Sequence, residues 1–419
     1  MNSFDAASIT GADFTDPELF SEGPPLELFR SLREAGPSWS PTPDDWPDEE
    51  GPGYWNITRA EEIAQVSHDD QTFSSWERGF LLRSDEMVPL ELIRTMMIGK
   101  DAPDHTQMRG IVSRAFTPLR VKRLEPVLRT RLNQLIDAVI ETGECDLVEN
   151  VARPYTCHVI ADLLGVPLAD RDLLFGWTDA ILNYNDPEVA AKGSGEEAMI
   201  EATSYMLRLI AERENDPRDD LVTALGRAEF EGERMPIDMQ AGLFIQLFVA
   251  GLDTTRNTIA FGMHALIDHP DQRQVLLDEP ELIQTAIEEI LRWTNVVMYM
   301  RRTALKDTEI GGNRISQGDS VAMWYSSGSR DPELVEDPDK FDVRRTQCPH
   351  QAFGGGGRHF CLGSSLARLE LRIAFEELLR RMPDMELDGQ PTRVRTNFIQ
   401  GYKSMPVRFT PGTRETTCD

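Results

Sequence analysis

Apolar residues recur at helical spacing along most of the chain, and the alternation typical of strands is confined to short stretches. The spacing predicts several helices between residues 128 and 222 and three longer ones over 236–268, 281–293 and 364–381. Short strands are expected at 53–58, 296–300 and 405–409, and a hairpin is expected at 310–315. The pattern therefore predicts a mainly α fold, a helical body with small peripheral β-sheets.

A run of four glycines leads into a cysteine just before the last long helix, in the sequence FGGGGRHFCLG over residues 353–363. Each glycine costs roughly 0.5–1 kcal/mol of folding entropy relative to alanine, so something must offset four in a row. A glycine run is usually retained where the backbone passes close to a bound group. Cys361 comes just before the N-terminus of a predicted helix, which suggests that a thiolate holds this group. The alternative is a flexible linker beside a buried free cysteine.

The centre of the predicted helix over 236–268 departs from an ordinary core helix. Gly251 costs about 1 kcal/mol inside a helix, and Asp253 and Thr254 end a fully apolar run. Because threonine hydroxyls can bond back to helix carbonyls and bend the helix, we expect a local opening here. A hydroxyl and a carboxylate facing a cavity would suit proton delivery.

Composition narrows the class of protein. The 419 residues carry a net charge of −28, which argues against nucleic acid or an anionic membrane as a general partner. The five cysteines are scattered singly, as expected in a reducing compartment and not in a disulfide framework or a zinc site. No secretory signal or membrane-spanning run is visible, so we expect a cytoplasmic protein without a membrane anchor.

Basic residues gather in one stretch of this acidic chain. Between residues 109 and 131, seven Lys or Arg residues are opposed only by Glu125. Such a basic island is typical of a docking surface for an acidic partner, although a solvated helix face is the alternative. His105 and Arg109, four residues apart, would share one helix face and form a two-pronged site for an anion.

Five motifs, in this order, resemble the cytochrome P450 (haem-thiolate monooxygenase) superfamily over roughly residues 101–409. They are H-x-x-x-R at 105 and 109, A-G-x-D-T-T over 250–255, E-x-x-R at 289 and 292, F-D-x-x-R over 341–345, and G-x-G-x-H-x-C-x-G over 355–363. There is one departure, because Phe353 lies eight positions before Cys361, where the family's aromatic residue lies seven before it and Gly354 takes its place. The four-glycine variant most resembles bacterial soluble members that act on terpenoid, steroid or branched lipid substrates.

The resemblance implies a single domain over residues 1–419, with residues 1–20 loosely ordered and haem b between the long central helix and the helix after the cysteine. Cys361 would be the thiolate ligand of the iron, whose electron push favours O–O cleavage. Asp253 and Thr254 would deliver protons. Haem contacts are implied for His105, Arg109, Ala250, Arg302, Phe353, His359 and Gly363. A buried structural network behind the loop would comprise Glu289, Arg292 and Arg345.

The reaction implied is insertion of one oxygen atom of O2 into a hydrophobic small molecule. The substrate pocket would contain Met87, Met97, Val249, Val296, Val297, Phe398 and Ile399. No flavin or nicotinamide motif is visible, so a ferredoxin and its NAD(P)H-dependent reductase would supply electrons. The ferredoxin would dock on Arg114, Lys122, Arg123 and Arg358. The alternatives are a peroxide-driven haem-thiolate hydroxylase, against which the Asp253–Thr254 pair argues, and a non-catalytic haem sensor, which needs neither a proton relay nor a basic docking face.

Overall fold

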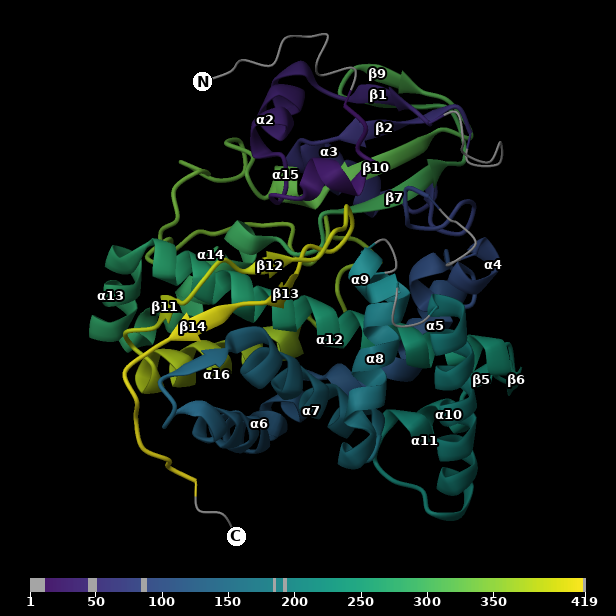
Figure 1. Ribbon diagram of the computed structural model, residues 1–419. Helices are drawn as coiled ribbons and strands as arrows, with labels where there is room; N and C mark the ends of the chain where they lie inside the picture. Colours follow the sequence, from purple (N-terminus) through teal and green to yellow (C-terminus); the bar gives the residue numbers. More distant parts are fainter. Residues whose placement is uncertain (1–11, 44–50, 84–88, 184–185, 191–193, 417–419) are drawn as a thin grey trace.

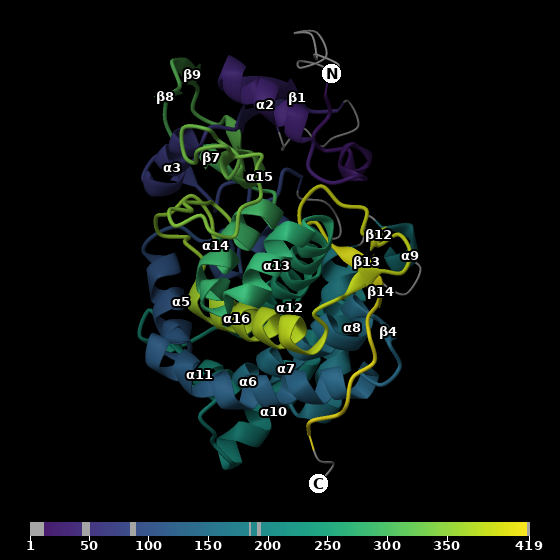
Figure 2. The same ribbon diagram turned by 90° about the vertical axis from the view of Figure 1, so that its left-hand side faces the viewer.

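Helices dominate a computed structural model that describes residues 12–43, 51–83, 89–183, 186–190 and 194–416. The longest, α12 (Ile237–Asp268), runs through the middle of the helical body, and α16 (Ser364–Arg381) packs against it (Figures 1 and 2). The predicted bounds of both helices are correct to within one residue. Around them pack α6 (Pro118–Val139), α7 (Arg153–Leu164), α8 (Arg171–Leu182), α10 (Gly195–Asn215) and α14 (Ile283–Thr294). The predicted mainly α fold is confirmed.

Shorter helices complete the body and cover its edges. They are α2 (Leu26–Ala35), α3 (Ala60–His68), α4 (Leu90–Ile93), α5 (Asp104–Ser113), α9 (Pro187–Ala190), α11 (Leu221–Gly226), α13 (Pro270–Asp278) and α15 (Tyr325–Gly328). No helix of the described residues is long and apolar enough to cross a membrane.

One sheet of five strands forms a separate lobe above the helical body (Figure 1). Its strand order is β1 (Ser38–Pro41), β2 (Gly53–Ile57), β10 (Ser320–Trp324), β7 (Tyr299–Ala304) and β3 (Phe73–Ser74). Only the β2–β10 pair is parallel. The strand expected over 296–300 begins later than predicted, at Tyr299, because Val297 forms only an isolated bridge with Ile399.

The smaller sheets are peripheral, as predicted. They comprise β11 (Glu386–Leu387), β14 (Pro406–Arg408) and β4 (Glu144–Asp146); β12 (Thr392–Arg393) with β13 (Tyr402–Ser404); β5 (Glu229–Phe230) with β6 (Glu233–Arg234); and β8 (Thr308–Ile310) with β9 (Asn313–Ile315).

Helix α12 joins two hydrophobic clusters, one around each of its halves. The half before Gly251 packs in a cluster with α7, α8 and α10, and the half after it packs with α6, α14 and α16. A Cβ at Gly251 would collide with the side chain of Ile160 on α7, so this glycine permits close helix packing. The helix is continuous through this point, and the expected local opening is therefore wrong.

The N-terminal residues that the structure describes are well packed. Phe14 and Phe20 are buried, and their rings lie 5.2 and 5.8 Å from the ring of Trp324 at the end of β10. The expectation that residues 1–20 are loosely ordered does not hold for residues 12–20. The physical reason is that these aromatic side chains supply part of the core beneath the five-stranded sheet.

Candidate active site

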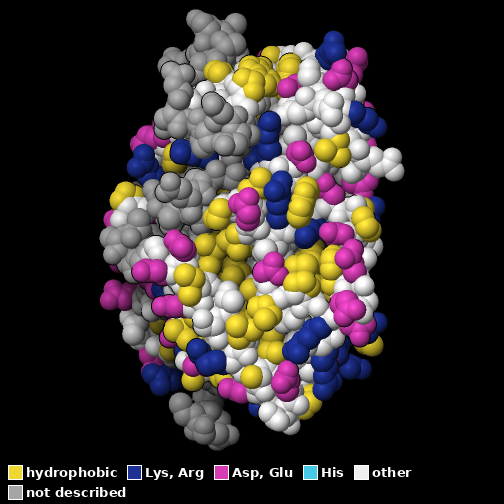
Figure 3. All heavy atoms as spheres, turned by 90° about the vertical axis from the view of Figure 1, so that its right-hand side faces the viewer, with side chains coloured by type: hydrophobic (Ala, Val, Ile, Leu, Met, Phe, Trp, Pro, Cys, Tyr) yellow, Lys and Arg dark blue, Asp and Glu magenta, His cyan; other side chains and the backbone are white. Residues whose placement is uncertain are grey.

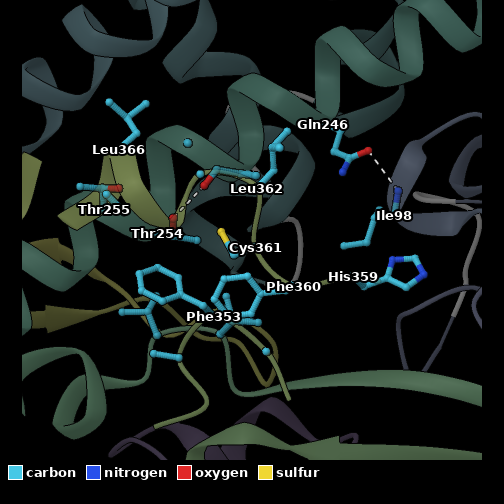
Figure 4. Close-up of a pocket in the computed structure, with 18 of the residues that line it drawn as sticks. Ile98, Gln246, Thr254, Thr255, Phe353, His359, Phe360, Cys361, Leu362 and Leu366 are labelled. Atoms are coloured by element: carbon cyan, nitrogen blue, oxygen red, sulfur yellow. Dashed lines mark hydrogen bonds between the residues drawn. The ribbon is translucent and has the colours of Figure 1, made fainter. Parts of the chain in front are cut away.

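Cys361 lies three residues before α16, and its sulfur faces an internal cavity (Figure 4). Burial raises the pKa of the Cys361 thiol. The backbone N–H groups of Gly363 and Ser364 donate to the sulfur and act in the opposite direction, as does the charge of Arg109. These donors at a helix N-terminus are the environment that stabilises a thiolate ligand.

The glycines before the cysteine are required mainly by the backbone and by close packing. A Cβ at Gly355 would lie 2.9 Å from the side chain of Ile63 on α3 and would overlap Ser67. Backbone angles φ between 69° and 97°, which favour glycine, occur at Gly354, Gly356 and Gly357. The entropy cost of the run is thus offset largely by the fit of the loop against α3. Gly354 itself also lines the cavity.

The extra glycine leaves Phe353 in the wall of the cavity. The carbonyl oxygen of Phe353 accepts a hydrogen bond from the N–H of Cys361 at 3.1 Å. On the outer side of the ring, the Arg368 guanidinium lies 4.5 Å from the ring centroid, and the His350 ring lies 5.8 Å away. Glu288 accepts hydrogen bonds from Arg368 at 2.7 and 2.8 Å, and its carboxylate lies 3.1 Å from His350 Nε2. This cluster fixes Phe353 from behind.

Thr254 on α12 faces the same cavity as the cysteine (Figure 4). Its hydroxyl donates to the carbonyl oxygen of Ala250 at 2.7 Å, which confirms the predicted bond back to the helix. The hydroxyl of Thr258 donates in turn to the carbonyl oxygen of Thr254 at 2.8 Å. A hydroxyl is therefore held at the cavity surface without any break in the helix.

Asp253 does not line the cavity, contrary to expectation. Its carboxylate is buried and accepts hydrogen bonds from Arg256 and from Asn257. Burial raises the pKa of Asp253 to about 6, although Arg256 opposes the rise. The Asp253 carboxylate is held by Arg256 and Asn257 of its own helix, whereas Thr254 and Thr255 both line the cavity. Proton relay by Asp253 would require its carboxylate to leave these partners.

Four cationic or titratable side chains line one part of the cavity, namely His105, Arg109, Arg302 and His359. The rings of His105 and His359 lie 4.3 Å apart, and Nδ1 of His105 is buried without a hydrogen-bond partner. Arg302 is 4% exposed and donates to the carbonyl oxygen of Arg301; within the described chain it has no carboxylate in ion-pair contact. Burial lowers its pKa. Buried cations without counter-charges are unfavourable, so this part suits an anionic group.

The cavity borders a second, mostly apolar one. Both are lined by Ile98, Gln246, Ala250, Thr254, Val297 and Met300. Of the predicted substrate residues, Met97 and Val296 line the first cavity, Val297 lines both, and the second contains Val249, Phe398 and Ile399. Met87 lies outside the described residues. A long hydrophobic molecule could therefore extend from the second cavity to Thr254.

Comparisons with known proteins agree with this site. The cytochrome P450 family model matches residues 195–397. The steroid C26-monooxygenase of Rhodococcus jostii is 38% identical over 403 residues, 95% of this chain and 85% of the relative. The methyl-branched lipid omega-hydroxylase of Mycobacterium tuberculosis is 39% identical over 387 residues, 91% of this chain and 90% of the relative. The chain belongs to the cytochrome P450 family.

A solved P450 structure shows how far the likeness extends. The Mycobacterium marinum cytochrome P450 in complex with pseudoionone superposes with a TM-score of 0.89 at 36% identity, over 98% of this chain and all of that one. The present P450 is thus a haem-thiolate monooxygenase. Its residues fit the cofactor, since Cys361 can supply the thiolate and the buried Arg302 and His105 can receive the propionates.

Tyr325 and Gln246 are among the residues of the P450 site that sequence reasoning missed. Tyr325 lines the haem cavity, and its buried hydroxyl bonds with Ser67 and the backbone of Gly355. It follows β10 with no motif to mark it. Gln246 accepts a hydrogen bond from the N–H of Ile98 at 3.2 Å, where both cavities meet (Figure 4). The sequence could have indicated Gln246, because it is a polar residue within an apolar stretch of α12.

The predicted structural network is fully buried at its centre. Arg292 donates two hydrogen bonds to Glu289, at 2.7 and 2.9 Å, and both side chains are 0% exposed. Arg345 donates to the same carboxylate at 3.2 Å. The two arginines also donate to backbone carbonyl oxygens between residues 329 and 340. The network therefore anchors the long irregular segment that precedes the cysteine loop.

The predicted docking residues differ in their availability. Three are exposed and make no ion pair with other described residues: Arg114, Lys122 and Arg123. Arg358 is engaged instead, because it bonds to Asp70 and donates to the Thr106 hydroxyl at 2.7 Å. Figure 3 shows the side of the molecule that carries α5, where Lys and Arg side chains gather towards the lower right of the view.

Proposed function

We propose that this P450 hydroxylates an elongated hydrophobic molecule, of the terpenoid, steroid or branched-lipid class. The observation that carries the proposal is the apolar second cavity, which shares lining residues, Thr254 among them, with the cavity that contains Cys361. The relatives' names agree with it, since one acts at C26 of a steroid and the other at the omega position of a methyl-branched lipid. Both positions are at the end of a chain.

The protein's own residues have distinct parts in this reaction. Haem held by a cysteine thiolate supplies activation of O2, because the thiolate pushes electron density to the iron. The N–H groups of Gly363 and Ser364 hold the thiolate, and Phe353 covers one part of the cavity. Thr254 presents its hydroxyl to the cavity as a proton carrier of α12. The apolar wall excludes water and orients the substrate by hydrophobic contact.

The electron supply is part of the same proposal. A ferredoxin with its NAD(P)H-dependent reductase would deliver electrons, docking on the exposed cations Arg114, Lys122 and Arg123. A cytoplasmic location likewise stays a prediction. The basic island on an otherwise acidic chain supports the docking of an acidic ferredoxin.

The test begins with the reduced, carbon-monoxide-bound spectrum of the purified holoenzyme, which reports thiolate ligation of the iron. Spin-state titrations then compare cholesterol, a methyl-branched fatty acid and pseudoionone. The best ligand is turned over with ferredoxin and its reductase under labelled O2, and we expect one labelled oxygen atom in a terminal hydroxyl group. Turnover with hydrogen peroxide alone, at the same rate, would instead support the peroxide-driven alternative. Absence of any ligand response or product would overturn the proposed substrate class.

A further inference from the structure

A third cavity lies outside the active site, between α12, the end of α14 and the β12–β13 hairpin. The hairpin lies beside α12 in Figures 1 and 2, and the Tyr402 ring on β13 packs 4.2 Å from the Phe261 ring on α12. Residues of the N-terminal segment, from Glu22 to Leu26, complete the cavity. The active site described above leaves this cavity without a use.

Two guanidinium groups line the cavity with incomplete counter-charges. Arg330 is 6% exposed and stacks 3.7 Å from the centre of the Trp293 ring. Its nearest carboxylate, Asp339, is 3.6 Å away and does not line the cavity. Arg393 lies 5.1 Å from the rings of both Phe261 and Tyr402, and across the described chain no carboxylate is within ion-pair distance of it. Two cations on one cavity favour an anionic occupant.

A buried hydroxyl adds an independent sign of a ligand. Ser326 is 3% exposed and lines the cavity, and its hydroxyl has no hydrogen-bond partner. Leaving such a group unsatisfied costs about 1–3 kcal/mol, which a ligand oxygen would recover. The acidic residues that line the cavity are more exposed, because Glu22 is exposed and the Asp268 side chain is 60% exposed. The buried charged group of the cavity is thus a cation, Arg330, and the Ser326 hydroxyl is a buried donor without a partner.

The cavity is close to the active site but separate from it. Thr294 lines both, and the side-chain amide of Gln400 donates to its carbonyl oxygen. Gln400 also donates through its N–H to the carbonyl oxygen of Val296 at 3.0 Å. This hydrogen-bonded segment forms the wall between the two spaces. An occupant would contact the back of the wall that holds Val296 against the substrate.

We propose that the third cavity binds a small organic anion with a flat aromatic ring, such as an aromatic carboxylate. The carboxylate would accept hydrogen bonds from Arg393 and Ser326. The ring would pack against the aromatic side chains of Phe261, Trp293 and Tyr402, which form the apolar part of the lining. Arg330 would contribute its charge from the wall beside Trp293.

The test is calorimetric titration of benzoate into the holoenzyme saturated with an iron-ligating azole, which occupies the active site. We expect one benzoate per chain. Benzamide, which has the same ring without the charge, should bind at least tenfold more weakly. Failure to detect benzoate binding with the azole present, or equal binding of benzamide, would overturn the proposal.

Two variants place the site. Arg393→Met retains the aliphatic stem and should weaken benzoate binding by about tenfold or more, because a charged hydrogen bond is lost. Ser326→Ala should weaken it by about 2- to 10-fold. Arg395→Met is the matched control, since Arg395 is on the same segment, pairs with Glu18 at 3.5 Å and does not line the cavity. Unchanged binding in both test variants, or an equal loss in the control, would contradict the assignment.

Discussion

The proposed reaction depends on a single hydroxyl group, that of Thr254, to carry protons. It is held at the cavity surface by its bond to the Ala250 carbonyl oxygen, and no carboxylate of α12 lines the cavity beside it. Thr254→Ala removes the hydroxyl and leaves the helix intact. We therefore expect normal haem content and a normal carbon-monoxide spectrum, but a product rate lower by roughly 100-fold, with reductant diverted to hydrogen peroxide.

Product formed per NAD(P)H consumed is the measurement for this variant. Thr254→Ser is the matched control, because it retains a hydroxyl at the same position and should recover most of the coupling. If Thr254→Ala uses reductant as productively as the parent enzyme, the proton-carrying role of this hydroxyl is wrong.

A second prediction at the residue scale concerns the cluster behind Phe353. Burial would raise the pKa of Glu288, but Arg368 and His350 outweigh it and lower the pKa to about 2. A depressed carboxylate pKa stabilises the fold above the unfolded value of about 4.5 and loses this contribution as the pH falls towards 2. Glu288→Gln should therefore lower the free energy of unfolding by about 1–3 kcal/mol at neutral pH.

The difference between the parent and Glu288→Gln should narrow once the pH falls below about 4.5, as measured by urea unfolding at several pH values. Glu333→Gln is the control, because Glu333 is exposed and forms no ion pair within the described chain. A difference that stays constant down to acid pH would show that the carboxylate charge is not what holds the cluster.

At the scale of elements, α14 is fastened to the irregular segment before the cysteine loop by one buried carboxylate. Arg345 shares Glu289 with Arg292, and removing it would leave part of a buried charge unpaired. Arg345→Ala should cost about 3–5 kcal/mol and yield protein that does not retain haem. The adjacent Arg344 pairs with Glu279 on the surface, so Arg344→Ala should change stability by less than about 1 kcal/mol.

Haem content and thermal unfolding of these two variants, measured side by side, test whether the Glu289 network is structural. A stable Arg345→Ala protein with full haem content and altered kinetics would assign the network a catalytic part instead of a structural one.

The elements also show what the sequence could and could not predict. Helical periodicity predicted α12 and α16 almost to the residue, and the resemblance to the P450 family implied that Cys361 and Thr254 would meet in one cavity. The direction in which a side chain points was harder to predict from the sequence. Asp253 is assigned to the cavity from the break in the apolar run and from its motif, but neither shows that Arg256 and Asn257 bind its carboxylate.

Contacts between distant segments were beyond the sequence for a different reason. Arg358 was expected to be free for a partner, but Asp70, 288 residues away, binds it. The glycine run is expected to pass close to a bound group, and the sequence does not show that side chains at Gly355, Gly356 and Gly357 would also collide with α3. The third cavity likewise combines residues from position 22 to position 402. None of these pairs has a local signature, because only the folded topology brings them together.

At the scale of the whole molecule, the charge distribution determines how an electron donor can approach. The chain has a net charge of −28, so an acidic ferredoxin is repelled by most of its surface. Part of the basic island is already neutralised, because Arg120 pairs with Asp219 and Arg129 with Glu376 and Glu377. The exposed cations Arg114, Lys122 and Arg123 are the part of the island left for a partner.

The double charge reversal Arg114→Glu with Lys122→Glu tests this docking surface. Reduction of the enzyme by a reduced [2Fe–2S] ferredoxin, followed by stopped-flow formation of the carbon-monoxide complex, should slow by about tenfold or more at low salt. Because salt screens the steering, the parent and variant rates should converge at high ionic strength. Lys306→Glu with Arg314→Glu is the control with the same change of net charge, since both side chains are exposed and Arg314 lies on β9 in the sheet lobe. Equal slowing by the control would mean that only net charge matters, and an unchanged rate in the double variant would place the donor elsewhere.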